Sequence, residues 1–258
     1  METLRVTLVQ SSQFWEDKRA NFAHFDAHFT QIGETDLVLL PEMFHTGFTM
    51  NVKPLAEEYN ESSALLWLKN KAITHQTAIY TSFICRENDL FFNRGVFVYP
   101  NGETVIYDKR KLFTLAKEDE NYTAGTAEKI VLYKGFKFLL SICYDLRFPE
   151  ILRNKMLNPT EAKYDVLLNV ANWPERRSLH WKSLLIARAI ENQCFLVGVN
   201  RVGTDENGLT YSGYSVAYTP LGQNLSNITP SIEQIETVIL EKSTLTEIRQ
   251  KLNFLDDI

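Results

Sequence analysis

The apolar run Phe138-Leu139-Leu140-Ser141-Ile142 ends at Cys143, and the chain continues as Tyr144-Asp145-Leu146-Arg147-Phe148-Pro149-Glu150. A short run of this kind, with one small polar residue and no alternation, is typical of a strand that is buried on both faces. Such strands belong to sheets that are covered by other layers, so the run predicts an α/β fold built in layers. It also places a thiol at the carboxyl end of a buried strand.

Three other apolar runs end at polar or aromatic groups in the same way. Residues 36–40 lead into Pro41-Glu42, residues 104–107 lead into Asp108-Lys109, and residues 165–170 lead into Asn172-Trp173. In layered α/β folds, the carboxyl ends of neighbouring strands converge on a crevice that often binds a ligand. We therefore expect a carboxylate, an ammonium and a thiol to meet there.

Strand-like and helix-like patterns mix along the whole chain. Further expected strands are 4–10, 78–85, 91–99, 194–199 and 237–240, and expected helices are 22–29, 64–72, one from Ser178 to about residue 192, and one capped by Ser243. Both serines are candidate N-caps because a hydroxyl can accept from the first free amides of a helix. Linker-like or low-complexity stretches are absent from the sequence. Residues 1–258 are therefore expected to form one α/β domain.

Composition and charge exclude several classes of protein. The 258 residues carry a formal net charge of −5, which argues against a nucleic-acid partner. The sequence has no apolar stretch of about 18 residues, so we expect no membrane span. The first ten residues lack the apolar core of a signal peptide, and three cysteines are too few for a disulfide framework. We therefore expect a cytoplasmic protein.

A thiol, a carboxylate and an ammonium together suit acyl transfer. A nearby cation lowers the pKa of a thiol, and a carboxylate held close can accept its proton as general base. The ammonium can stabilise a developing oxyanion. These three groups therefore indicate hydrolysis of a small amide through a thioester, a reaction that needs no cofactor. Taken singly, the same residues have ordinary interpretations: Cys143 as a packing residue, Glu42 as a solvated loop carboxylate, and Lys109 as part of a charged run.

Three segments resemble the signature segments of the nitrilase, or carbon–nitrogen hydrolase, superfamily. They are 41–44, 107–113 and 143–150, in the order and separation of that family. The likeness continues through 171–174, 187–192, 200–203 and 211–215, so it spans almost the whole chain. The resemblance implies a four-layer α-β-β-α sandwich, assembled as a homodimer or a higher homo-oligomer.

The resemblance also implies a role for individual residues of this chain. Glu42 matches the general base, Lys109 the cation that stabilises the tetrahedral intermediate, and Cys143 the nucleophile. Glu118 matches a second glutamate that positions the lysine and the substrate. The backbone N–H of Tyr144 matches the other oxyanion donor.

Within the superfamily the chain is most similar to the bacterial omega-amidase branch. Members of that branch hydrolyse the terminal amide of 2-oxoglutaramate and 2-oxosuccinamate. The segments most similar to this branch are 42–48 and 172–174, followed by Arg176 and residues 178–181. Lys111 and Asn253 depart from the residues that many members carry, His and Pro. Two alternatives stay open: an amidase for another small amide, such as an N-carbamoyl compound or deaminated glutathione, and a catalytically silent binding or scaffold relative.

Such substrates carry a carboxylate far from the amide, which calls for a fixed cation. Arg147 lies four residues past the cysteine and can offer a bidentate fork, although a structural ion pair with Glu150 is an equal alternative. Asn172 is a further candidate substrate contact. The aromatic side chains of Phe44, Trp173 and Phe148 are candidates for an apolar wall, and each could instead be an ordinary core residue.

The histidines give little indication of a metal. His24 and His28 have the i, i+4 spacing of a ligand pair on a helix, but the sequence offers no evident third ligand. We therefore expect a solvated helix face there and no metal site. A cysteine–histidine protease would need another histidine as base, and no local signature supports one.

Overall fold

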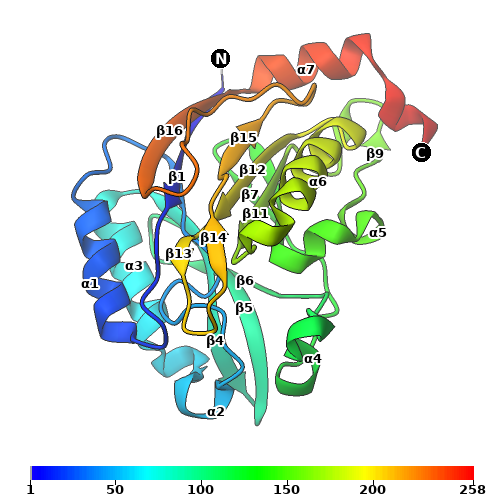
Figure 1. The fold of residues 1–258 in the computed structure, drawn as a ribbon. Helices are drawn as coiled ribbons and strands as arrows, with labels where there is room; N and C mark the ends of the chain where they lie inside the picture. Colours follow the sequence, from blue (N-terminus) through cyan, green and yellow to red (C-terminus); the bar gives the residue numbers. More distant parts are fainter. Residues whose placement is uncertain (1) are drawn as a thin grey trace.

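The chain folds into two stacked β-sheets with helices on both outer faces, a four-layer α-β-β-α sandwich (Figure 1). This is the predicted architecture. The fold is described from a computed structural model, which describes residues 2–258. None of the helices in this range is long and apolar enough to cross a membrane.

The first sheet carries both the amino-terminal strand and the last strand of the chain. Its strands follow the order β16 (Gln234–Glu241), β1 (Thr3–Gln10), β2 (Leu37–Leu39), β4 (Ala78–Glu87), β5 (Leu90–Val98) and β6 (Thr104–Asp108), with β3 (Glu57–Glu58) beside β4. Strands β1, β2 and β4 are parallel, whereas β5 and β6 return by antiparallel hairpins.

The second sheet holds the strand that leads to Cys143 in its interior. Its order is β15 (Val216–Tyr218), β12 (Phe195–Asn200), β11 (Val166–Ala171), β8 (Phe136–Ile142) and β7 (Ile130–Tyr133). Strands β8, β11 and β12 are parallel, so their carboxyl ends lie at one edge. Two small antiparallel pairs complete the strands: β9 (Met156–Asn158) with β10 (Glu161–Ala162), and β13 (Val202–Thr204) with β14 (Thr210–Ser212).

Two helices cover the outer face of each sheet. On the first sheet lie α1 (Lys18–Phe29) and α3 (Ser63–His75), and on the second lie α5 (Pro149–Leu152) and α6 (Ser178–Glu191). Helices α2 (Val52–Leu55) and α4 (Glu118–Asn121), each four residues long, occur in the connections, and α7 (Lys242–Lys251) follows the last strand.

Strand β2 and the residue after it show why uninterrupted apolar runs form this fold. Leu37 and Leu39 belong to the core between the two sheets, whereas Val38 and Leu40 belong to the core under α1 and α3. Alternate side chains of a strand point to opposite faces, so both faces of this strand need apolar residues. The run 36–40 satisfies both cores at once.

Both predicted serine caps are wrong, and the reason is local. Residues Glu175–Arg177 form a short 3₁₀ helix that continues into α6, so Arg177 occupies the cap position and Ser178 is already helical. Helix α7 begins at Lys242, directly after β16, and its cap position is Glu241.

The prediction of a solvated helix face at the two histidines is wrong for His28. Its exposed fraction is 7%, because α1 packs against the segment that follows β1. His28 Nε2 lies 2.8 Å from the Ser11 hydroxyl there.

Candidate active site

Cys143 stands at a strained turn directly after β8. Its φ is +42°, a left-handed conformation that is uncommon for a residue with a side chain. The buried carboxylate of Asp145 holds this turn, because its Oδ2 accepts from Ile142 N at 2.9 Å and from the Tyr107 hydroxyl at 2.7 Å. Its Oδ1 accepts from Lys111 N at 2.9 Å. Asp145 thus fixes the cysteine relative to the end of β6, in the other sheet.

Lys109 lies between two glutamates in a closed ionic cluster. Its Nζ is 2.9 Å from Glu42 Oε1 and 2.9 Å from both carboxylate oxygens of Glu118. The lysine side chain is 1% exposed and the glutamates are 0% exposed. Burial works to lower the pKa of Lys109, but the two carboxylates outweigh it and raise that pKa well above its ordinary value. Lys109 is therefore an ammonium at any pH at which the protein functions.

Backbone and amide donors fix both carboxylates. Asn93 Nδ2, in the middle of β5, donates to Glu42 Oε1 at 2.8 Å and to Glu118 Oε1 at 3.2 Å. Asn172 N donates to Glu42 Oε2 at 2.9 Å, and Phe113 N donates to Glu118 Oε2 at 2.6 Å. With their oxygens engaged in this way, neither carboxylate can rotate freely.

The thiol of Cys143 is close enough to this cluster for its charges to act on it. Burial and the charge of Glu42 raise the pKa of Cys143 well above its ordinary value, and Lys109 only partly opposes them. The sulfur is therefore a neutral thiol at rest. The expectation that the cation alone would favour a thiolate is not met, so attack requires a base to remove the proton during the step.

A cavity of about 480 Å³ opens onto the sulfur. The sequence-predicted residues among its lining residues are Lys109, Cys143, Tyr144, Arg147, Asn172 and Trp173. Glu42 and Glu118 are not among the lining residues and are fully buried. The cavity thus presents the thiol and the ammonium to a ligand, while the carboxylates stay in contact with Lys109.

Comparison with known proteins agrees with this arrangement. Residues 5–250 match the carbon–nitrogen hydrolase family. The chain belongs to that family.

The relatives of this carbon–nitrogen hydrolase include amidases. It is 41% identical over 253 residues to the omega-amidase YafV of Escherichia coli, covering 97% of this chain and 95% of that protein. It is 34% identical over 226 residues to a 2-oxoglutaramate amidase of Bacillus subtilis, covering 86% and 85% respectively. A crystal structure of a superfamily protein from Xanthomonas campestris, which carries an arsenic adduct in its active site, superposes with a TM-score of 0.95 at 38% identity, covering 99% and 97% of the two chains.

Three arginines lie along the cavity of this carbon–nitrogen hydrolase: Arg147, Arg176 and Arg177. Arg147 stacks on the Trp173 ring, with its guanidinium carbon 4.5 Å from the ring centroid, and Arg177 lies 5.1 Å from that of Phe113. Glu150, the alternative partner predicted for Arg147, pairs instead with Lys111 at 3.3 Å. Burial, together with the charge of Arg176, lowers the pKa of Arg177. This end of the cavity therefore favours an anion.

Two predicted wall residues do not line the cavity. Phe44 is fully buried in the core under α1 and α3, because the chain turns at Met43, whose φ is +46°, and sends the ring away from the thiol. Phe148 packs against the core between the sheets and under the Lys111 ammonium, 4.6 Å from its ring centroid. Of the three aromatic candidates, only Trp173 borders the cavity, whose other aromatic lining residues are Trp15, Phe48, Phe113, Tyr144 and Tyr211.

Sequence reasoning also missed Asn93, Asp145 and the arginine Arg177. Asn93 could have been found as the one amide inside the apolar strand β5, and Asp145 as the acid two residues after the candidate nucleophile. Arg177 had no comparable signal, because its place at the cavity depends on the short 3₁₀ helix before α6.

Proposed function

We propose that this carbon–nitrogen hydrolase is an omega-amidase. It hydrolyses the terminal amide of 2-oxoglutaramate or 2-oxosuccinamate and releases ammonia and a 2-oxo dicarboxylate. The observation that carries the proposal is the cluster of three arginines in the same cavity as the thiol. Such a substrate has a carboxylate at one end and an amide at the other, which matches a cationic end and a nucleophilic end.

The first half of the reaction acylates the cysteine. The Cys143 sulfur attacks the amide carbon as Glu42 takes the thiol proton, and the carbonyl oxygen becomes an oxyanion between the Lys109 ammonium and the backbone N–H of Tyr144. The tetrahedral intermediate collapses with cleavage of the C–N bond, and Glu42 passes the proton to the departing nitrogen. Ammonia leaves, and the acyl group remains as a thioester.

Water completes the cycle along the same path. Glu42 accepts a proton from water as it attacks the thioester carbon, and the same two donors stabilise the second oxyanion. Collapse breaks the C–S bond, the proton returns to the thiolate, and the carboxylic acid leaves. Glu118 acts through Lys109, whose ammonium it holds in place with two contacts of 2.9 Å.

Lys109 is suited to stabilise the oxyanion because two carboxylates, rather than the substrate, stabilise its charge. Since Glu42 and Glu118 both contact it, the ammonium is fixed before substrate arrives and need not reorganise in the transition state. Catalysis then depends on the amide being presented at the correct distance, which the arginines achieve by binding the remote carboxylate.

Ammonia release across a panel of small amides tests the proposal. The panel contains 2-oxoglutaramate, 2-oxosuccinamate, an N-carbamoyl amino acid and deaminated glutathione, for which the released dipeptide amine is measured in place of ammonia. We expect the first two to have the highest kcat/KM. Turnover of the carbamoyl compound with no reaction of 2-oxoglutaramate would overturn the proposal, and no turnover of any amide would favour the silent relative.

A matched pair of substrates tests the arginine cluster separately. Arg147→Gln is expected to lower kcat/KM for 2-oxoglutaramate by about tenfold to 100-fold, the range for losing a charge-assisted contact. The methyl ester of 2-oxoglutaramate, which lacks the carboxylate, should be hydrolysed equally by both proteins. An equal loss for both substrates would assign Arg147 to the structure rather than to recognition.

We further propose that the protein acts in the cytoplasm as a homodimer or a higher homo-oligomer. The location is supported by three cysteines that are all free and buried, as in proteins from a reducing compartment. The assembly state follows from the family resemblance, and light scattering on the purified protein tests it. A monomer at micromolar concentration would contradict it.

A further inference from the structure

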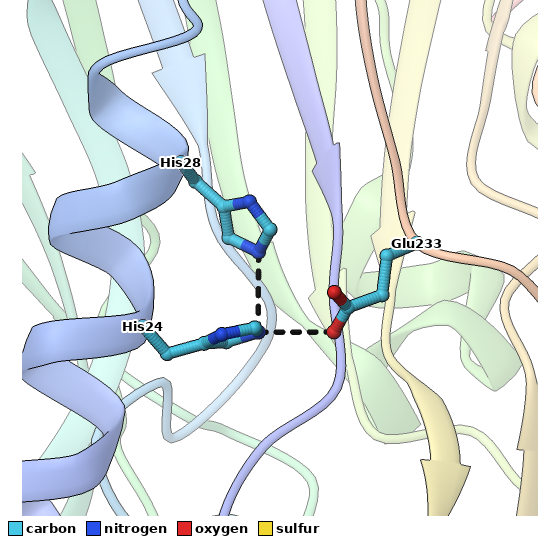
Figure 2. Close-up of side chains that lie close together, drawn as sticks. All are labelled: His24, His28 and Glu233. Carbon is cyan, nitrogen blue, oxygen red and sulfur yellow. Dashed lines mark hydrogen bonds and ion pairs between the residues drawn. The ribbon is translucent and has the colours of Figure 1, made fainter.

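Three potential metal ligands converge outside the active site, on the edge of the first sheet. His24 and His28 project from successive turns of α1, and Glu233 immediately precedes β16, more than 200 residues later in the chain (Figure 2). The two Nε2 atoms are 3.2 Å apart, and His24 Nε2 is 2.9 Å from Glu233 Oε1. The ligand atoms of the three residues all lie within 4.8 Å of one another.

Hydrogen bonding alone does not account for this arrangement. His24 Nε2 has three polar neighbours: His28 Nε2 at 3.2 Å, Ser11 Oγ at 3.0 Å and Glu233 Oε1 at 2.9 Å. A ring nitrogen carries either one hydrogen or one lone pair in its plane, so it can form only one good hydrogen bond. The Ser11 hydroxyl also lies 2.8 Å from His28 Nε2 and can donate to only one of the two rings, so no single assignment of protons gives each of these contacts its own hydrogen. A cation between the two imidazoles and the carboxylate would satisfy His24, His28 and Glu233 together.

The carboxylate is held in position by a neighbouring residue, as is usual around metal sites. Ser12 donates to Glu233 Oε1 through its backbone N–H at 2.8 Å and through its hydroxyl at 2.5 Å. These donors orient the oxygen toward the imidazoles, as outer hydrogen bonds commonly orient the ligands of a metal.

We propose that His24, His28 and Glu233 form a binding site for a divalent transition-metal ion, with zinc as the best match. Two imidazoles and one carboxylate are a ligand set that zinc accepts, whereas magnesium and calcium prefer oxygen alone. For Zn–N distances of about 2.0–2.1 Å, a tetrahedron separates its ligand atoms by about 3.3 Å. Two of the three observed separations, 3.2 and 2.9 Å, are close to this value, and the third, between His28 and Glu233, is within 4.8 Å. Side-chain exposures of 20% for His24 and 38% for Glu233 leave room for water as fourth ligand.

The bound ion would join two parts of the fold that are more than 200 residues apart in the chain. It would tie α1 to the segment before β16 and lie beside Ser11 and Ser12. The next residue, Gln13, donates through Nε2 to the backbone oxygen of Glu42 at 2.9 Å. We therefore expect the ion to stabilise the fold and the segment next to the active site, without taking part in the chemistry.

Metal binding to the full chain tests the proposal directly. All proteins carry Cys143→Ala, so that the active-site thiol cannot bind the probe. The parent, His24→Gln, Glu233→Gln and the control His75→Gln are treated with a chelator and dialysed against zinc chloride, and bound zinc is then counted per chain. Cobalt chloride in a parallel series reports the coordination geometry through its visible absorption. The control removes a histidine of α3 that lies outside the cluster.

The expected result is one zinc per chain in the parent and in His75→Gln, with affinity at least about tenfold weaker in the other two variants. Zinc should raise the unfolding midpoint of the first pair only. Unfolding curves in chelator establish that each variant is folded, and both substituted positions are partly exposed. No zinc bound by the parent, or equal binding by all four proteins, would overturn the proposal and leave the cluster as a set of hydrogen bonds.

Discussion

Replacing Lys109 with methionine removes the charge at the centre of the ionic cluster while nearly preserving its volume. The parent ammonium contacts both Glu42 and Glu118, and all three side chains are at most 1% exposed. Loss of the cation leaves two carboxylates buried next to each other. Breaking a buried pair in this way typically costs about 3–5 kcal/mol of the free energy of unfolding. Loss of an oxyanion donor lowers kcat by a further ~10²–10³-fold in the protein that remains folded.

The stability loss in Lys109→Met should depend on pH with a defined sign. Burial already raises the pKa of Glu118 in the parent, and removing the cation that opposes this raises it further. A carboxyl group whose pKa is higher in the folded state than in the unfolded state favours folding at low pH and disfavours it as pH rises. The variant should therefore lose stability more steeply than the parent as the pH rises above the ordinary glutamate pKa of about 4.3.

A second substitution separates the structural effect from the catalytic one. Lys109→Met combined with Glu118→Gln removes one of the two unpaired charges, so urea unfolding should show that part of the lost stability returns. Ammonia release from 2-oxoglutaramate should not recover, because the oxyanion still lacks its cation. Recovery of activity together with stability would refute the reasoning and assign Lys109 to the fold alone.

Three other predictions concern the surroundings of the thiol. Asn93→Leu removes the amide shared by the two glutamates, so we expect about 1–3 kcal/mol of destabilisation in urea unfolding and a kcat at least tenfold lower, measured by ammonia release. Asp145→Asn cannot accept all three of its hydrogen bonds and should lower kcat more than it raises KM, since it positions the sulfur. Brief iodoacetamide exposure followed by peptide mapping should label Cys143 before Cys85 or Cys194, because Cys143 lines the cavity and is 9% exposed, whereas the other two are 0% exposed. Faster labelling of either other cysteine would contradict this.

The apolar runs predicted the layered fold because their side chains must fill cores on both faces of a sheet. For the same reason the strand ends correctly indicated where Lys109, Cys143 and Asn172 would meet. The strand end before Glu42 indicated its place in the same way, but not its burial, since a carboxylate after a strand can be buried or solvated. Glu118 follows no strand and depended on the family resemblance.

Features that depend on backbone turns or on distant contacts could not be predicted. The left-handed turn at Met43 directs Phe44 to a different core from the one that borders the thiol. No residue pattern in the sequence predicts this turn. His24 and Glu233 are 209 positions apart and come together only because β16 pairs with β1. The sequence alone therefore could not indicate a third ligand for the histidine pair.

The central claim is that Cys143 is the nucleophile. The most direct test compares the rates at which Cys143→Ala and the parent release ammonia from 2-oxoglutaramate. The substitution removes a single heavy atom, the sulfur, from a cavity wall, and equal unfolding midpoints would confirm that the fold is intact. If the sulfur forms the thioester, the rate should fall by at least about 10³-fold, as for other enzymes that lose their nucleophile. Equal rates in the two proteins would show that the reaction does not pass through Cys143.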